Sequence, residues 1–268
     1  MDSDGPHDTS APPGKLVVRL LDELAGRATA PSLVEPLGGW QLRATADAPF
    51  RRANSVLPNG ALPGDVTLDD AIETVEEFYE SRSAPARFHV SPAAQPTDLD
   101  AVLAARGYAI EAPVVVMAAG ATIVLGRTEG DGRVTKEGRR MWERAYASMH
   151  GDSTNARARV LAYGRAMHAV RSPAAAVVFP PKAGRSVALG FAVADKGWTG
   201  IFGMGTRPES RRQGAATAVL HTLAQWAVEQ GAPRLYLQVE EDNDAARTLY
   251  ERAGFVDTYR YHYRSRDL

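Results

Sequence analysis

The stretch GMGTRPESRRQGAA at residues 203–216 decides how this chain is interpreted. A strand-like run ends in it, a tight polar loop follows, and a helical pattern begins at Ala215. The amides of such a loop and of the first helical turn point toward one place, where the helix dipole favours an anion. Gly214, Ala215 and Ala216 carry almost no side chain, so a pyrophosphate can approach the backbone closely. We therefore predict a phosphate-binding turn at the start of this helix.

Two adjacent arginines strengthen this interpretation. Arg211 and Arg212 add positive charge beside the turn. An ordinary helix-capping turn also contains glycine, but the coincidence of Pro208, both arginines, Gly214 and Ala216 favours phosphate binding over simple capping. The chain has neither a Walker Lys-Ser/Thr pair nor a Gly-x-Gly-x-x-Gly run, which argues against an unrelated nucleotide-binding domain.

The turn resembles motif A of the GCN5-related N-acetyltransferases (GNAT), in which Arg/Gln-x-x-Gly-x-Gly/Ala follows the end of a strand. It stands here as Arg211-x-x-Gly214-x-Ala216, preceded by Thr206-x-Pro208. A second motif of the family follows in the same order, with the following residues: Val239, Asn243, Ala246, Leu249, Tyr250, Gly254 and Phe255. The resemblance covers approximately residues 198–264 and is specific because both motifs occur together.

The resemblance implies a role for each matching position. The strand at residues 203–206 would splay from its neighbour and leave the backbone of Met204 and Thr206 free to bond the pantetheine arm. Tyr250 would donate a proton to the departing thiolate, and the Met204 amide would stabilise the developing oxyanion. The resemblance assigns twelve residues to acetyl-coenzyme A: Met204, Gly205, Thr206, Arg211, Arg212, Gln213, Gly214, Ala215, Ala216, Asn243, Ala246 and Tyr250.

The sequence does not single out a general base for the acceptor amine. Glu240 and Glu241 follow a predicted strand, and Asp195 lies near the end of another. His150 and His168 are further candidates. Each of these five side chains is equally consistent with an ordinary surface position, and a chain of water molecules is a further alternative.

The first half of the chain resembles the second. Residues 87–108 and 234–255 share a pattern at constant offset (234 − 87 = 147), and both end in a Gly-aromatic pair. The first half has GALPG at residues 60–64 in place of the arginine-rich turn, and Leu103 and Pro96 stand where Tyr250 and Asn243 stand in the second. We therefore predict two tandem GNAT-like lobes, of which the N-terminal lobe is degenerate and forms one wall of an acceptor cleft.

The alternation of predicted strands and helices indicates an α/β fold, with a mixed sheet flanked by helices. We assign residues 1–14 to a disordered lead-in, 15–125 to the degenerate lobe and 126–268 to the catalytic domain. Thr67 is expected to cap one helix. Further helices are expected at residues 16–24, 99–105, 136–149, 156–170, 215–229 and 245–252. Strands are expected at residues 40–43, 50–57, 87–90, 174–179, 186–193, 198–206, 235–239 and 255–263, with one or two more within 113–125.

Composition narrows the classes of function. The 268 residues carry a net charge of −1, which gives no reason to expect nucleic acid or an anionic membrane as a partner. The absence of Cys excludes disulfides, thiolate metal sites and a cysteine nucleophile. The six His are scattered, so no metal site is predicted. The N-terminus does not resemble a signal peptide and no apolar run is long enough to span a membrane. We expect a cytoplasmic monomer or homodimer.

We therefore expect an acetyl-CoA-dependent N-acetyltransferase acting on a primary amine of a small molecule. Tandem members of the family include enzymes that resemble aminoglycoside acetyltransferases, such as the kasugamycin 2′-N-acetyltransferases. A polycationic acceptor is best held by carboxylates. Acidic residues are plentiful in the first half, for example the six residues Asp65, Asp69, Asp70, Glu73, Glu76 and Glu77, and the sequence does not show which of them line the cleft.

Two alternatives remain open. The terminal YRYHYR at residues 259–264 resembles ribosomal-protein N-terminal acetyltransferases, which keeps a protein acceptor in view. A non-catalytic acyl-CoA-binding sensor is the other. The polar run RRANS at residues 51–55 is interpreted either as a source of acceptor contacts or as an edge strand that faces water.

Overall fold

The computed structural model describes residues 13–46, 48–130, 138–151, 153–180 and 186–268. Most of the predicted lead-in therefore lies outside the described residues. The first half of the chain contains α1 (Lys15–Ala28), β1 (Leu33–Leu37), β2 (Trp40–Ala44), η1 (Arg51–Ala53), β3 (Val56–Leu57), α2 (Leu68–Glu80), β4 (Ala86–Val90), α3 (Leu99–Ala105) and β5 (Ala109–Gly120). The second half contains α4 (Ala121–Arg127), α5 (Gly138–His150), α6 (Thr154–Ala169), β6 (Ala174–Phe179), β7 (Ala188–Asp195), β8 (Trp198–Thr206), η2 (Pro208–Ser210), α7 (Ala215–Glu229), β9 (Arg234–Glu240), α8 (Asp244–Arg252) and β10 (Val256–Arg266).

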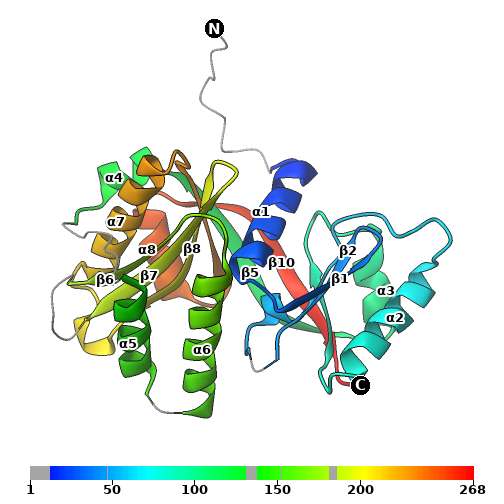
Figure 1. Cartoon of the computed structure of the whole chain (residues 1–268). Coiled ribbons are helices and arrows are strands. Elements are labelled where there is room, and N and C mark those ends of the chain that lie inside the picture. The colour runs from blue at the N-terminus through cyan, green and yellow to red at the C-terminus, as the bar shows by residue number, and fades with distance from the viewer. Residues whose placement is uncertain (1–12, 47, 131–137, 152, 181–185) are drawn as a thin grey trace, which may run out of the picture.

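A single mixed sheet runs through the molecule, in the strand order β1-β2-β3-β4-β10-β5-β9-β8-β7-β6 (Figure 1). Helices cover both of its faces. In β6, Ala175 and Val177 belong to the core beneath α7, whereas Ala176 and Val178 belong to the core beneath α5. Because alternate residues of a strand point to opposite faces, α5 and α7 lie on opposite sides of the sheet. The predicted α/β class with a helix-flanked mixed sheet is confirmed.

The pairing pattern of the first half recurs in the second. β1, β2 and β3 pair antiparallel in turn and β3 then pairs parallel with β4. The strands β6 to β9 repeat these directions. α7 begins 147 residues after α2 (215 − 68 = 147), which is the offset seen in the sequence. The last strand of each half lies in the other half's part of the sheet. The strand β10, from the end of the second half, lies between β4 and β5, and β5, from the end of the first half, pairs with β9. Neither half therefore completes its part of the sheet alone.

Three helices each cover a different part of the sheet. Beneath α2, a core is built on Ile72, Val75 and Phe78. Beneath α7, another is built on Val219, Leu220 and Leu223. The helix α1 packs over the middle of the sheet, where its apolar side chains meet tyrosines of β9 and β10. Burial of these apolar side chains is the main force that holds the three parts together.

The structure corrects two predicted elements and adds a third. Residues 50–57 form the short helix η1 and the two-residue β3, because the Asn54 amide bonds Thr45 N at 2.7 Å and Ala48 O at 2.8 Å and so folds this segment into a turn. Within the apolar run at residues 113–125, β5 ends at Gly120 and the chain continues as α4, which packs on α7. The edge strand β1, which is mostly exposed and contains Pro36, was not predicted.

Candidate active site

The strands β8 and β9 part midway along their length. They pair in parallel from Trp198 with Arg234 to Ile201 with Leu237, and no further. Beyond this point β8 stays paired with β7, through Leu189 with Gly205 and Ala188 with Thr206. A bulge interrupts that pairing, and Gly203 within it has a φ of +56°, a conformation that glycine adopts without strain. The β9-facing backbone edge of β8 after Ile201 is therefore left without a strand partner.

A cavity of about 430 Å³ opens at this parting. On one side it is lined by Met204 of β8 and by Asn243, Ala246 and Tyr250, four of the residues predicted to hold the cofactor. On the other side lie side chains from the first half, among them Arg52, and from α6. The two halves of the chain thus meet at one cavity. Gly205 and Thr206 continue β8 from its edge, toward the predicted phosphate-binding turn.

The turn between β8 and α7 is anchored at one end and open at the other. Arg207 is 6% exposed, and its guanidinium donates to Ser186 O at 2.8 Å and Ser148 O at 3.1 Å. The exposed residues Arg212 and Gly214 have positive φ values of +59° and +80°. In the part of the chain that the structure describes, the amides of residues 212–214 donate no hydrogen bond to the backbone. These amides are available to an anion.

The helix α7 begins without a cap of its own. Gly214 at its N-cap supplies no side-chain hydrogen bond, and its first turn contains no acidic residue. Arg211 and Arg212 are exposed beside it, and both lack an ion pair within the described ranges. Positive charge and uncapped amides at a helix start suit a phosphate group.

Tyr250 lies on α8 and faces the cavity. It is 8% exposed, and its ring packs edge-on against Phe255 with centroids 5.9 Å apart. Burial raises its pKa to about 12. The hydroxyl therefore keeps its proton throughout the physiological pH range.

Asn243 has a structural role that the sequence motif does not reveal. Its side-chain oxygen accepts a hydrogen bond from Ala246 N at 3.2 Å and so caps α8. Because that helix carries Tyr250, the cap also fixes the position of the tyrosine. Asn243 lines the cavity as well, so its amide nitrogen remains close to a bound molecule.

Of the five candidate bases, only Glu240 lines the cavity. Asp195 is paired with Arg27 at 3.1 Å, and Glu241 with Arg260 at 3.1 Å. The ring of His150 stacks on Tyr146, while His168 Nδ1 lies 2.7 Å from Gly164 O. Sequence motifs did not indicate Gln238 of β9 or Arg159 and Tyr163 of α6, which also line the cavity.

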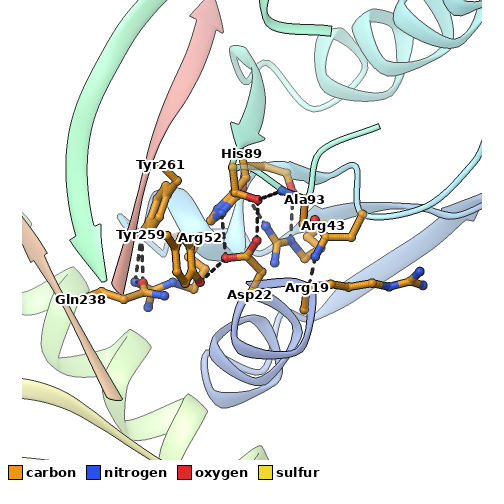
Figure 2. Close-up of polar contacts among 12 residues, drawn as sticks. Arg19, Asp22, Arg43, Arg52, His89, Ala93, Gln238, Tyr259 and Tyr261 are labelled. Atoms are coloured by element: carbon orange, nitrogen blue, oxygen red, sulfur yellow. Dashed lines mark hydrogen bonds and ion pairs between the residues drawn. The ribbon is translucent and has the colours of Figure 1, made fainter. Parts of the chain in front are cut away.

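A buried polar cluster lies between α1 and the sheet (Figure 2). Asp22 accepts hydrogen bonds from Ser91 Oγ and Tyr259 Oη, both at 2.7 Å. His89 Nε2 lies 3.3 Å from Asp22, outside hydrogen-bond geometry, and its ring stacks on Tyr261 at 4.0 Å. The cluster joins α1, β4 and β10. It therefore ties the exchanged strand to the first half.

The chain matches proteins described as acetyltransferases along nearly its whole length. Residues 18–264 match the family described as probable histone acetyltransferase Rv0428c C-terminal. A Bacillus subtilis (strain 168) protein, described as the uncharacterized N-acetyltransferase YobR, is 31% identical over 253 residues, which span 92% of this chain and 98% of that protein.

Two solved structures share the fold. A GCN5-related N-acetyltransferase from Kribbella flavida superposes with a TM-score of 0.66 at 18% identity, over 93% of this chain and 95% of that one. A tandem GNAT protein from the clavulanic acid biosynthesis pathway gives 0.65 at 12% identity, over 96% and 90%. The chain belongs to the acetyltransferase family that its residues 18–264 match. It is an acetyltransferase, and its fold is that of the GNAT proteins.

The features of the site suit a molecule such as acetyl-CoA. The free edge of β8 offers backbone groups to an amide-containing arm, and the open start of α7 offers amides and arginines to a pyrophosphate. No group of His, Asp or Glu among the residues with a described structure could hold a metal ion. Likewise, no helix in those ranges is long and apolar enough to cross a membrane.

Proposed function

We propose that this chain transfers the acetyl group of acetyl-CoA to a primary amine of a small molecule, in the cavity where β8 and β9 part. The observation that carries the proposal is the continuity of the site. The unpaired edge of β8 leads from the cavity that contains Tyr250 to the uncapped start of α7. A long cofactor with a phosphate end and a thioester end matches this arrangement.

We assign the residues as follows. The amides of residues 212–216 and the side chains of Arg211 and Arg212 hold the pyrophosphate, while the Arg211 amide donates to Pro208 O at 3.3 Å. The backbone of Met204 and Thr206 bonds the arm, which also passes Gly205, Asn243 and Ala246. When bound, acetyl-CoA supplies a thioester whose carbonyl carbon an uncharged amine can attack.

The protein then has two tasks in the reaction. The Met204 N–H, on the free edge of β8, donates to the carbonyl oxygen as negative charge develops there. The Tyr250 hydroxyl donates its proton to the sulfur as the carbon–sulfur bond breaks. The amine nitrogen loses one proton to solvent as the carbon–nitrogen bond forms, and Tyr250 regains its proton from solvent, so the products are an amide and a free thiol.

The N-terminal half, which we assign to residues 15–125, is proposed to be a lobe that does not bind cofactor. Its helix α2 is closed by a capping box of Thr67 and Asp70, and Asp69 adds negative charge there. The adjoining loop is filled by the backbone, because a Cβ on Gly39 would lie 2.5 Å from Gly60. Both features oppose a phosphate at the position that corresponds to the start of α7.

The acceptor is proposed to be a small molecule because segments of both halves surround the cavity. The wall formed by residues 49–52 reaches α6, where the rings of Phe50 and Tyr163 meet edge-on at 4.6 Å. None of the six carboxylates expected to hold an aminoglycoside lines the cavity. For example, Asp69 is paired with Arg106, and Glu76 with Arg266. The cavity therefore gives no support to a polycationic acceptor such as kasugamycin.

The matching family's description names histone acetylation, which is the acceptor class to test against a small molecule. A lysine-rich tail is also polycationic, and it would meet the arginines that line the cavity, Arg51, Arg52 and Arg159. The second rival is an acyl-CoA sensor without turnover. A tyrosine at the cavity, with its proton retained up to high pH, argues for catalysis instead.

The test is thiol release from acetyl-CoA with a panel of amines that includes amino acids, polyamines, kasugamycin and histone-tail peptides. Turnover of a small amine supports the proposal. Turnover of the peptides alone would assign a protein acceptor, and tight CoA binding without any turnover would assign a sensor.

A further inference from the structure

The acceptor side of the cavity is positively charged. Three arginines line it, namely Arg51, Arg52 and Arg159, against the single carboxylate of Glu240. Of these, Arg51 is already neutralised. Its Nε lies 2.5 Å from Glu111 Oε1, and its Nη1 lies 3.7 Å from Glu240 Oε1. Partial burial alone would raise the pKa of Glu111, but its two arginine partners hold that pKa below the ordinary value. Glu111 is therefore ionised.

Arg52 lacks such a partner. Its guanidinium meets only uncharged groups in the described structure, the Gln238 Oε1 and, at 3.5 Å, the Tyr261 hydroxyl (Figure 2). Arg159 of α6 likewise meets uncharged groups in the described structure: its Nε donates to the Asn155 side-chain oxygen at 3.4 Å, and its guanidinium lies beside the Tyr146 hydroxyl. Two cations thus border the cavity without a carboxylate beside them. A cation removed from bulk water is costly unless an anion accompanies it.

Two buried hydrogen-bond donors at the same place are also unsatisfied. The Nε of Arg52 and the Nε2 of Gln238 are buried and have no partner among the described atoms. Both residues line the cavity. Buried donors are rarely left unpaired in a native protein, so a ligand that only accepts hydrogen bonds is expected here. An ionised carboxylate accepts without donating, and its geometry matches the guanidinium fork.

The remaining surface on this side is aromatic. Phe50, Tyr163, Phe202 and Tyr261 line the cavity, and the Arg52 guanidinium lies over the Phe202 ring at 5.9 Å. Such a wall favours an apolar body on the acceptor. The volume of about 430 Å³ is shared with the end of the cofactor arm, so the acceptor is of amino-acid size.

We propose that the acceptor is a primary amine bearing a carboxylate, an α-amino acid with an apolar side chain, and that Arg52 and Gln238 bind its carboxylate. This inference rests on the proposed function and specifies its substrate class. Arg52 binds the acceptor and takes no part in proton transfer. Arg159 adds positive potential from α6.

The first experiment compares L-phenylalanine with L-phenylalaninamide, and L-leucine with L-leucinamide, as acceptors. Each kcat/KM is calculated from the concentration of the uncharged amine, because the amino groups of the acid and the amide have different pKa values. The acids are expected to have a kcat/KM about 10- to 100-fold higher, the range that a charged hydrogen bond supplies. Equal values for acid and amide would overturn the inference and leave the acetyltransferase proposal intact.

Variants of Arg52 test the assignment. Arg52→Gln should remove the preference by raising KM for the acids, while KM for the amides and the affinity for CoA stay within about twofold. Arg52→Lys should retain part of the preference because its charge remains. Arg82→Gln, which removes one positive charge far from the cavity, is the matched control and should keep the full preference.

A binding measurement separates this inference from turnover. N-acetyl-L-phenylalanine and N-acetyl-L-phenylalaninamide, the product-side probes, are titrated into the full chain saturated with CoA. The acid should bind about tenfold tighter, and Arg52→Gln should abolish the difference. Acid-selective binding without turnover would support the binding site and refute the proposed reaction. Absence of selectivity in both assays would refute the inference.

Discussion

At the scale of single residues, Tyr250 connects burial to chemistry. Its pKa of about 12 lies above the ordinary value, so the hydroxyl is protonated at every pH below that point and is lost as a donor only above it. We expect kcat to rise with pH as the acceptor amine loses its proton, with no alkaline decline below about pH 11. Tyr250→Phe should lower kcat about 100-fold across the profile and leave the CoA dissociation constant unchanged. Steady-state rates from pH 6 to pH 10, with calorimetric CoA binding, check this.

The buried Asp22 cluster makes a residue-scale prediction about stability. Burial lowers the pKa of His89, and although burial alone would raise that of Asp22, its partners hold it below 3.8. Both groups therefore contribute stability at neutral pH that is lost on acidification, from pH 6.5 downward for His89 and from 3.8 downward for Asp22. Asp22→Asn should cost about 3 kcal/mol at pH 7 in urea unfolding. The exposed Asp65→Asn is the control, and an equal loss in both variants would contradict a role for the cluster.

The sequence could predict roles for Tyr250, Met204 and the phosphate-binding turn because motifs close in the chain carry them, and these roles stay predictions; the structure places Tyr250 and Met204 at the cavity. It could not identify the acceptor wall. Arg52, Arg159 and Gln238 belong to three segments far apart in sequence, and none lies in a recognisable spacing. The unsatisfied donors that single out Arg52 and Gln238 exist only after folding has buried them.

At the scale of elements, the two ends of α7 offer a matched pair. Gly214 and Gly231 have φ values of +80° and +68°, and a Cβ on either would meet nothing within 4 Å. Alanine at each should cost about 1 kcal/mol through backbone strain alone. Only Gly214→Ala should weaken CoA binding, about tenfold or more, since its methyl group faces the proposed pyrophosphate. Calorimetric CoA titration with urea unfolding measures both effects. Equal CoA affinity in the two variants would remove the phosphate role of the turn.

Elements with a clear period and caps were predictable, and ambiguous apolar runs were not. The helix α2 begins at Leu68 with the predicted N-cap Thr67, and α7 spans the predicted residues 215–229. The run at residues 113–125 divides into β5 and α4, because its last part packs on another helix instead of a strand. Local sequence does not determine whether such a run forms a strand or a helix, because tertiary contacts decide between the two.

At the scale of the whole molecule, the exchange of β5 and β10 couples the halves. The duplication is visible in the sequence, but the exchange is not, because either strand could complete either half. β10 pairs with β4 from His262 with Val90 to Arg266 with Ala86, and with β5 along its length. Removing either half would therefore expose sheet edges and the tyrosines beneath α1. The cavity, which needs residues 49–52 opposite β8, depends on the same coupling.

We therefore predict that the chain unfolds as one cooperative unit instead of two lobes. Hydrogen exchange followed by mass spectrometry, at increasing urea concentrations, should give β4 and β9 amides the same free energy of global opening. Asp22→Asn, which lies in the first half, should lower that free energy equally in both strands, because β10 transmits the loss. A β4 that opens before β9, or a variant that affects β4 alone, would show lobes of independent stability. The acceptor wall would then open without unfolding the cofactor site, and acceptor binding would protect β4 selectively.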